Sequence, residues 1–148
     1  MATIAIASDH AGFQLKGELV AELGKLGHLV NDLGPADTSS VDYPDFATRV
    51  TDAVAGGRAL LGVLICGTGT GMSITANKVH GIRAALCRTE FEARMARQHN
   101  DANVLCLGQR VTGTGLAIET LKAFLHATFE GGRHAARVEK IRQVEAKR

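Results

Sequence analysis

The stretch LLGVLICGTGTG, residues 60–71, limits the possible folds more than any other part of the chain. It is a continuous apolar run that ends in Cys66 and leads into a loop with glycine at every second position. An uninterrupted run of Leu, Val and Ile is typical of a parallel strand buried on both faces, and residues 72–78 can continue as a helix behind the loop. The stretch therefore predicts a strand, a glycine loop and a helix start, as in an open α/β sheet.

Strand-like and helix-like segments alternate along the rest of the chain. Apolar runs typical of strands cover residues 3–8, 28–33, 60–66, 82–87 and 102–107. Apolar residues at helical spacing cover residues 13–26, 43–55, 90–99, 113–129 and 133–147. This order predicts a three-layer, Rossmann-like α/β fold, in which a five-stranded parallel sheet carries helices on both faces. We expect a single domain over residues 1–148, with a C-terminal helix from about residue 133 that is free to pack on a partner subunit.

Composition and charge exclude several classes of protein. Seventeen Lys and Arg against fifteen Asp and Glu give a net charge of +2, and the basic residues are spread out, which argues against a nucleic-acid partner. No apolar run approaches the roughly 18 residues of a membrane span, and the chain start lacks a signal-peptide pattern. Cys66, Cys87 and Cys106 are not spaced as metal pairs, and we expect three reduced thiols. These features predict a cytoplasmic protein that binds neither nucleic acid nor membrane.

Cys66 is the first candidate for chemistry, because ligands of open α/β sheets bind where the chain leaves a strand. The glycines after it allow the backbone to approach a ligand and turn its N–H groups inward, and the following helix adds its positive end. Such surroundings favour a thiolate. The alternative is an inert buried thiol, which is the commoner role of a single cysteine at a strand end. Cys87 and Cys106 lack such loops, and we expect them in the core.

Two other uses of the glycine loop fit the sequence less well. Cysteine phosphatases place an arginine six positions after the cysteine, where this chain has Met72. A dinucleotide-binding turn has the spacing G-x-G-x-x-G after the first strand, whereas here the spacing is G-x-G-x-G after the third. The chain also has no H-E-x-x-H motif and no paired C-x-x-C, so we expect neither a metal nor a cofactor.

Asp9, His10, His99 and Asn100 are further candidates. Asp9 and His10 directly follow the first strand, so they should share the sheet edge that Cys66 borders, although Asp9 is equally suited to cap the helix that starts near Gly12. His99 fits an ordinary histidine at the edge of a buried helix face. Its neighbour Asn100 favours a functional role, because the pair offers an acid–base group and an amide together.

Arg133 and Arg137 lie four residues apart at the start of the last helix, so like charges share one face at the positive end of the helix dipole. A phosphate that bridges both guanidinium groups would resolve this, and Arg110, just past the fifth strand, could join it. The alternative is a solvated face, because an exposed pair of this kind costs only a few tenths of a kcal/mol, roughly.

The chain also resembles a known family, the ribose-5-phosphate isomerase B family, which includes galactose-6-phosphate and allose-6-phosphate isomerases. The resemblance spans nearly the whole length. The motifs that carry it are Ser8-Asp9-His10-Ala11-Gly12-Phe13, Asp42-Tyr43-Pro44, Ile65-Cys66-Gly67-Thr68-Gly69, Ala76-Asn77-Lys78, Gly81-Ile82-Arg83-Ala84, Arg97-Gln98-His99-Asn100-Asp101, and Glu130-Gly131-Gly132-Arg133-His134 with Arg137. One branch of the family takes its base from a glutamate at the position of Thr75, so Cys66 together with Thr75 indicates the cysteine branch.

The resemblance implies a cofactor-free aldose–ketose isomerase of a small sugar phosphate, with Cys66 as the base and His99 in ring opening. It implies substrate binding by Asp9, His10, Gly67, Thr68, Gly69, Thr70, Gly71, Asn100, Arg110, Arg133 and Arg137. Ribose 5-phosphate, interconverted with ribulose 5-phosphate, is the expected substrate. The alternatives are allose 6-phosphate, galactose 6-phosphate or a four-carbon sugar phosphate, and a non-catalytic phosphosugar- or nucleotide-binding module that would need neither Cys66 nor His99.

The chain order predicts where His99 acts. Asp9, His10 and Cys66 follow strands and so belong to the carboxyl edge of the sheet, whereas His99 ends a helix and precedes the fifth strand, which places it at the opposite edge. A sheet of five-residue strands is about 17 Å deep, too far for an imidazole to span. We therefore expect a homodimer, alone or as a dimer of dimers, in which His99 of one subunit completes the active site around Cys66 of the other.

Overall fold

The computed structural model describes residues 1–148 and contains one parallel sheet with the strand order β2-β1-β3-β5-β4. The strands are β1 (Thr3–Ser8), β2 (Leu29–Asp32), β3 (Leu61–Cys66), β4 (Ala84–Leu86) and β5 (Val104–Gly108). The strand that holds Cys66 lies in the middle, between β1 and β5. The predicted Rossmann-like α/β fold with five parallel strands is confirmed.

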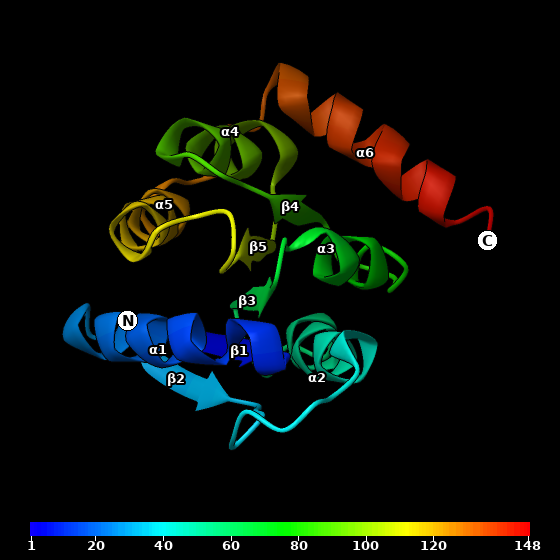
Figure 1. Ribbon diagram of the computed structural model, residues 1–148. Helices are drawn as coiled ribbons and strands as arrows, with labels where there is room; N and C mark the ends of the chain where they lie inside the picture. The colour runs from blue at the N-terminus through cyan, green and yellow to red at the C-terminus, as the bar shows by residue number, and fades with distance from the viewer.

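Helices cover both faces of this sheet, as Figure 1 shows. They are η1 (His10–Gly12), α1 (Phe13–Lys25), α2 (Tyr43–Ala55), α3 (Thr70–Ala76), α4 (Glu90–Asn100), α5 (Thr114–His126) and α6 (Arg133–Glu145). One core packs α1, α4 and α5 against one face of the sheet, and a second core packs α2 and α3 against the other. Helix α6 lies on the outside, next to α4, and ends near the C-terminus (Figure 1). None of these helices is long and apolar enough to cross a bilayer.

The central position of strand β3 explains why its sequence is apolar without interruption. All of its residues are buried, with Val63 and Ile65 in one core and Leu64 and Cys66 in the other. Gly62 allows α2 to pack closely on the sheet, because a Cβ there would be 2.6 Å from Val50 Cγ1. A strand flanked by two helical layers needs apolar side chains on both faces, so the alternation typical of a half-exposed strand is missing.

The parallel register sets the position of the loops that follow the strands. Ser8 pairs with Ile65, and Cys66 pairs with Gly108, so β1, β3 and β5 end at nearly the same level. The residues that follow, Asp9, Gly67 and Gln109, therefore leave the sheet side by side at its carboxyl edge. Ligands of open α/β sheets bind at this edge.

Several element boundaries differ from those predicted. Helix α3 begins at Thr70, two residues earlier than expected, because Gly69 adopts a left-handed conformation (φ 79°) that turns the chain directly into the helix. Strand β4 has only three residues, since it is an edge strand that pairs with β5 alone. The helices predicted to end at residues 129 and 147 end at His126 and Glu145. Asp42 is the N-cap residue of α2, but its side chain makes no capping hydrogen bond.

Candidate functional site

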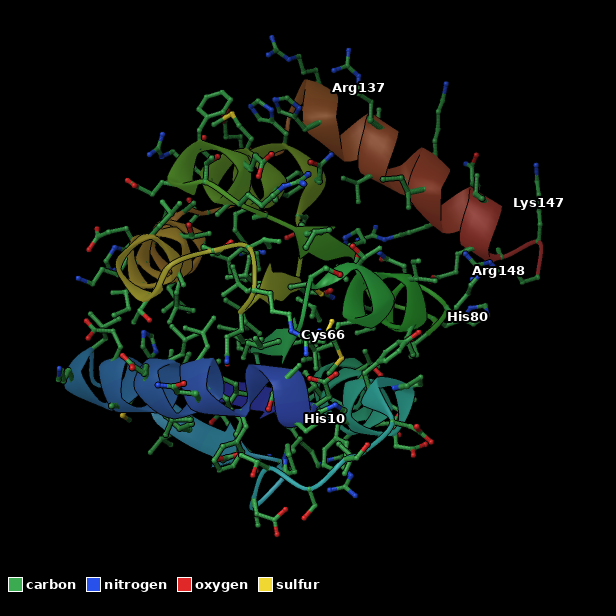
Figure 2. All side chains as sticks on the ribbon, viewed as in Figure 1. His10, Cys66, His80, Arg137, Lys147 and Arg148 are labelled. Carbon is green, nitrogen blue, oxygen red and sulfur yellow. The ribbon has the colours of Figure 1, made fainter.

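A cavity of about 280 Å³ opens beside Cys66 at the carboxyl edge of the sheet. It brings together residues that follow β1, β3 and β5 and one residue at the start of α2. The lining residues are Asp9, His10, Ala11, Tyr43, Cys66, Gly67, Thr68, Gly71 and Arg110. We call this group, with Gly69 and Thr70 of the same loop, the Cys66 site; Figure 2 shows Cys66 and His10 close together in the view.

The thiol of Cys66 is held by the loop that follows it. Only 5% of the residue is exposed, and the backbone N–H of Gly69 donates a hydrogen bond to Sγ at 3.1 Å. This contact requires glycine at position 69, because φ is +79° and a Cβ there would lie 2.9 Å from the backbone carbonyl group of Leu107. An N–H that points at sulfur stabilises the thiolate, which is the form of cysteine that can remove a proton.

The other two cysteines have the properties of core residues, as predicted. Burial raises the pKa of Cys87 to about 12, with a further contribution from the charge of Glu92. Burial also raises the pKa of Cys106, which has no exposed surface. No disulfide joins any of the three cysteines. Cys66 is therefore the one thiol of the chain that combines a cavity with a hydrogen-bond donor aimed at sulfur.

Asp9 and His10 reach the Cys66 site as their position after β1 predicted. Asp9 is 7% exposed, and its Oδ1 accepts a hydrogen bond from the N–H of Gly12 at 3.1 Å, so the capping role considered from the sequence is present. His10 Nδ1 accepts a hydrogen bond from the N–H of Val41 at 3.2 Å. In a neutral imidazole this leaves the proton on Nε2, which makes His10 a hydrogen-bond donor for an anionic or hydroxyl-bearing ligand.

Arg110 and Tyr43 complete the cavity. A Cβ at Gly67 would lie 3.1 Å from a terminal nitrogen of Arg110, so the guanidinium group lies against the glycine loop. A Cβ at Gly71 would lie 2.5 Å from the ring of Tyr43, so this ring packs on the same loop from α2. Tyr43 was not among the predicted site residues, although its place in the motif Asp42-Tyr43-Pro44 was a usable signal.

The remaining predicted residues lie elsewhere, at the end of α4 and the start of α6. The His99 ring stacks on the ring of His134 with centroids 4.1 Å apart, and His99 Nε2 lies 3.6 Å from Glu130 Oε1. Arg133 and Arg137 belong to the first turns of α6, and no carboxylate of this chain forms an ion pair with either. We call His99, Asn100, Glu130, Arg133, His134 and Arg137 the His99 cluster.

His134 is the buried member of the His99 cluster. It is 6% exposed, and loss of hydration lowers its pKa below the usual value for histidine. The neighbouring positive charges of His99 and Arg133 lower the same pKa further. His134 is therefore favoured as a neutral ring against which His99 can stack. Sequence spacing gave no sign of this pair, because 34 residues separate the two histidines along the chain.

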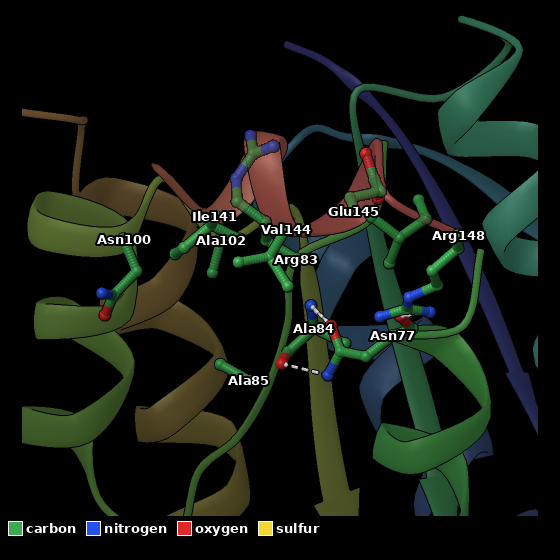
Figure 3. Close-up of a pocket in the computed structure, with 11 residues that line it drawn as sticks. Asn77, Arg83, Ala84, Ala85, Asn100, Ala102, Ile141, Val144, Glu145 and Arg148 are labelled. Atoms are coloured by element: carbon green, nitrogen blue, oxygen red, sulfur yellow. Dashed lines mark hydrogen bonds between the residues drawn. The ribbon is translucent and has the colours of Figure 1, made fainter. Parts of the chain in front are cut away.

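Two groups of predicted site residues are thus separate within one chain. None of His99, Asn100, Arg133 and Arg137 lines the cavity beside Cys66, and Figure 2 shows Arg137 far from Cys66 and His10. Asn100 instead borders a different cavity of about 350 Å³ between α6 and β4, drawn in Figure 3. Arg110, predicted to bind a phosphate together with Arg133 and Arg137, lies with the Cys66 site.

The His99 cluster also contains a potential set of metal ligands. The ligand atoms of His99, Glu130 and His134 all lie within 4.8 Å of one another. Two imidazoles and a carboxylate are a ligand set that zinc accepts. Arg133 adjoins His134, and its charge opposes a cation there. The chemistry that the two groups offer is otherwise that of a thiol, imidazoles, backbone N–H groups and guanidinium groups.

A buried thiol that accepts a hydrogen bond from a glycine-loop N–H, at the carboxyl edge of a Rossmann-like sheet, is the kind of site at which small α/β proteins bind ligands. The sequence model described as Ribose/Galactose Isomerase matches residues 4–141. Ribose-5-phosphate isomerase B of Escherichia coli is 50% identical over 148 residues, which are 100% of this chain and 99% of that protein. A putative sugar phosphate isomerase of Bacillus subtilis is 48% identical over 97% of each chain. The chain therefore belongs to the ribose/galactose isomerase family.

Solved structures agree with this assignment. Ribose-5-phosphate isomerase B of Clostridium thermocellum superimposes with a TM-score of 0.97 at 52% identity, over 98% of each chain. Ribose-5-phosphate isomerase B of Mycoplasma genitalium, solved with bound ribulose 5-phosphate, superimposes with a TM-score of 0.93 at 46% identity, over 99% of this chain and 97% of that one. The predicted family and its aldose–ketose isomerase class are confirmed.

Proposed function

We propose that the protein interconverts ribose 5-phosphate and ribulose 5-phosphate in the cytoplasm through an enediolate, without a cofactor. The observation that carries this is the Gly69 N–H aimed at Cys66 Sγ at 3.1 Å, in a cavity large enough for a pentose phosphate. The names of the relatives from Escherichia coli and Clostridium thermocellum, and the ribulose 5-phosphate bound in the Mycoplasma genitalium structure, support the same substrate.

In this mechanism Cys66 is the general base. Its thiolate removes the proton from C2 of the open-chain sugar to give the enediolate, the C2 hydroxyl proton passes to the C1 oxygen, and the thiol returns a proton to C1. Backbone N–H groups of the loop from Gly67 to Gly71 stabilise the oxygen on which negative charge develops. A donor of this kind contributes about 3 to 4 kcal/mol to transition-state stabilisation in well-studied enzymes.

His99 opens the sugar ring in the proposed mechanism. Ribose 5-phosphate is mostly cyclic, so a proton must leave the C1 hydroxyl and another must reach the ring oxygen before C2 can be deprotonated. A neutral imidazole can carry out such transfers near neutral pH. Arg110, Arg133 and Arg137 bind the phosphate, and Asp9, His10 and Asn100 bind sugar hydroxyls, so that the reacting carbons are positioned beside the thiolate.

We further propose that the two groups of residues meet across a homodimer. Residue 103, four positions after His99, accepts a hydrogen bond through its carbonyl from Gly62 N–H, at the amino end of β3, whereas Cys66 lies at its carboxyl end. Strands of this length separate the two edges by about 17 Å. A twofold axis would bring the His99 cluster of each subunit to the Cys66 site of the other, giving two shared sites.

Replacement of Cys66 by alanine tests the proposed chemistry. We expect Cys66→Ala to lose at least about 10³-fold in kcat/KM for ribose 5-phosphate, since the proposed mechanism takes the C2 proton with the thiolate. Cys87→Ala is the matched control, because the Cys87 thiol is also buried. This substitution should leave kcat/KM unchanged. Turnover at the wild-type rate in Cys66→Ala would show that the thiol is not the base. Phosphosugar binding without turnover in the wild-type protein would instead indicate a binding module.

A second measurement decides between related substrates. Pentose and hexose phosphates differ by one hydroxymethine unit, and relatives in this family are described as ribose and galactose isomerases. We expect kcat/KM to be higher for ribose 5-phosphate than for allose 6-phosphate, galactose 6-phosphate or a four-carbon sugar phosphate. A reversed order would retain the isomerase mechanism and change the preferred sugar.

A further inference from the structure

Helix α4 ends in an unusual way, directly after His99 and Asn100. The next residue, Asp101, has φ 48° and ψ 42°, and it is the one residue other than glycine with a positive φ in the chain. A side chain in this left-handed region costs free energy, although Asp and Asn tolerate it better than most residues. Other interactions must therefore hold the backbone in this conformation.

Two arginines supply those interactions. Arg83 donates from its Nε to the backbone carbonyl of Asp101 at 2.9 Å, and one of its terminal nitrogens lies 3.2 Å from the carboxylate oxygen Oδ2. Arg97 contacts the other carboxylate oxygen at 3.3 Å. The arginine side chains are only 16% and 15% exposed, so water screens these charges less than at an open surface. Arg83 and Arg97 therefore bind the carboxylate of Asp101 through both of its oxygens.

Both arginines are themselves anchored. The Arg97 guanidinium lies 5.7 Å from the centre of the Phe124 ring, which is fully buried in α5, and it also donates to the carbonyl of Ala102. The backbone of Arg83 exchanges hydrogen bonds with Asn103, through the side-chain oxygen at 2.8 Å and the backbone N–H at 2.9 Å. The contacts of the two arginines with Asp101 thus connect the end of α4 to Arg83, which directly precedes β4, and to the core beneath α5.

His99 and Asn100 have few restraints of their own. The His99 side chain is 36% exposed, stacks on His134, and makes no side-chain hydrogen bond; its polar contact is with Glu130 Oε1, 3.6 Å away. Figure 3 shows Asn100 with its side chain on α4, away from the dashed hydrogen bonds between Asn77 and Ala84. Their positions therefore depend on the backbone of the helix end, which Asp101 fixes.

We propose that Asp101 is a positioning residue for ring opening, held by Arg83 and Arg97 so that His99 and Asn100 are presented in the reactive orientation. This inference rests on the proposed role of His99. Asp101 itself touches neither substrate nor the reacting atoms. Loss of its carboxylate frees the last turn of α4, and an imidazole that is misplaced by about 1 Å can lose on the order of 10²-fold in rate.

The test separates ring opening from proton transfer at carbon. Ribulose 5-phosphate has no furanose form, because its C5 oxygen carries the phosphate. Exchange of its C1 hydrogen with D₂O therefore reports enediolate formation without any ring step, and net conversion to cyclic ribose 5-phosphate reports the whole reaction. We expect Asp101→Asn to lower net conversion at least tenfold and deuterium exchange less than twofold. Asp101→Gly, which also fits the left-handed backbone, should behave alike.

Thr89→Ala is the matched control on the same helix. Thr89 caps the opposite end of α4 through Oγ1, which accepts a hydrogen bond from Glu92 N–H at 3.1 Å. Loss of this cap should lower the melting temperature about as much as the Asp101 substitutions do. The ratio of deuterium exchange to net conversion should stay at the wild-type value. An unchanged ratio in both Asp101 variants, or the same change in Thr89→Ala, would overturn the inference. If His99→Ala also leaves the ratio unchanged, the proposed role of His99 fails as well; if it alone shifts the ratio, only the role of Asp101 fails.

Discussion

The Cys66 site and the His99 cluster are held in place by different parts of the protein. At the Cys66 site, the positions of the sulfur and of the Gly69 N–H follow from strands β3 and β5, which pair through Cys66 and Gly108. In the His99 cluster, stacking on His134 and a 3.6 Å contact with Glu130 hold an imidazole that is 36% exposed. One region is organised by backbone hydrogen bonds inside a sheet, and the other by side chains at the surface.

This difference matches the chemistry proposed for each region. A base that removes a carbon-bound proton needs a fixed relation to the N–H groups that stabilise the oxyanion, and a buried sheet edge provides it. A group that opens a ring meets sugars before they reach the base, and it has to be accessible. The His99 cluster also lacks a cavity of its own around His99, which fits a surface that is completed by a second subunit.

The largest expected effect concerns thiol reactivity, which should be confined to the Cys66 site. Burial raises the pKa of Cys87 to about 12, so at pH 8 only about one molecule in 10⁴ carries this thiolate. We expect iodoacetamide to modify one equivalent of native protein, at Cys66, and to do so more slowly when ribose 5-phosphate is bound. Peptide mapping by mass spectrometry identifies the modified residue. Equal labelling of Cys87 would show that the two environments do not differ as described.

A mixing experiment tests whether the two regions act together across subunits. Cys66→Ala and His99→Ala homodimers should each turn over poorly. Unfolding and refolding an equal mixture should recover about a quarter of wild-type activity, because half of the dimers are mixed and each mixed dimer has one intact site of two. Wild-type protein carried through the same steps corrects for refolding losses. A mixture as inactive as the single variants would place both residues in a site within one chain.

The sequence predicted the Cys66 site far better than the His99 cluster, and the reason is physical. Cys66, Asp9 and His10 follow strands directly, and parallel strands end at a common edge, so order along the chain predicts proximity in space. No comparable rule connects His99 with Glu130 and His134, which lie beyond a whole strand and helix. Their contacts depend on how α4 and α6 pack, and residue spacing says little about helix packing.

The fold was predictable for a similar reason. Strand β3 is apolar throughout because both of its faces are buried, and that pattern is visible without a structure. The start of α3 was misplaced by two residues, because it depends on the left-handed conformation of Gly69, which periodicity does not reveal. The role of Tyr43 was missed because the ring contacts Gly71 from a different helix.

A smaller effect is expected from a methyl group added behind the glycine loop. A Cβ at Gly108 would lie 2.5 Å from the backbone carbonyl carbon of Thr68. The backbone of Thr68 cannot move away from this Cβ without shifting the glycine loop. We expect Gly108→Ala to lower kcat roughly tenfold or more, because N–H groups misplaced by a fraction of an ångström stabilise the oxyanion less well. Gly113→Ala is the control, since a Cβ there meets nothing within 4 Å. Equal kcat values for the two variants would mean that the loop position is not critical.

The smallest effect concerns the pH dependence of stability, and it belongs to the His99 cluster. Burial, followed by the charges of His99 and Arg133, lowers the pKa of His134 in the folded protein. The unfolded chain, in which the histidine pKa is about 6.5, therefore binds more protons once the pH falls below that value. The stability that His134 contributes is complete above that pH and is lost as the pH falls through it.

Urea unfolding at pH 7.5 and pH 5.5 measures this effect. Between these pH values the free energy of unfolding should fall less in His134→Asn than in the wild type, whereas in Cys66→Ala it should fall by the wild-type amount. Identical drops in His134→Asn and wild type would show that this histidine does not couple the His99 cluster to protons.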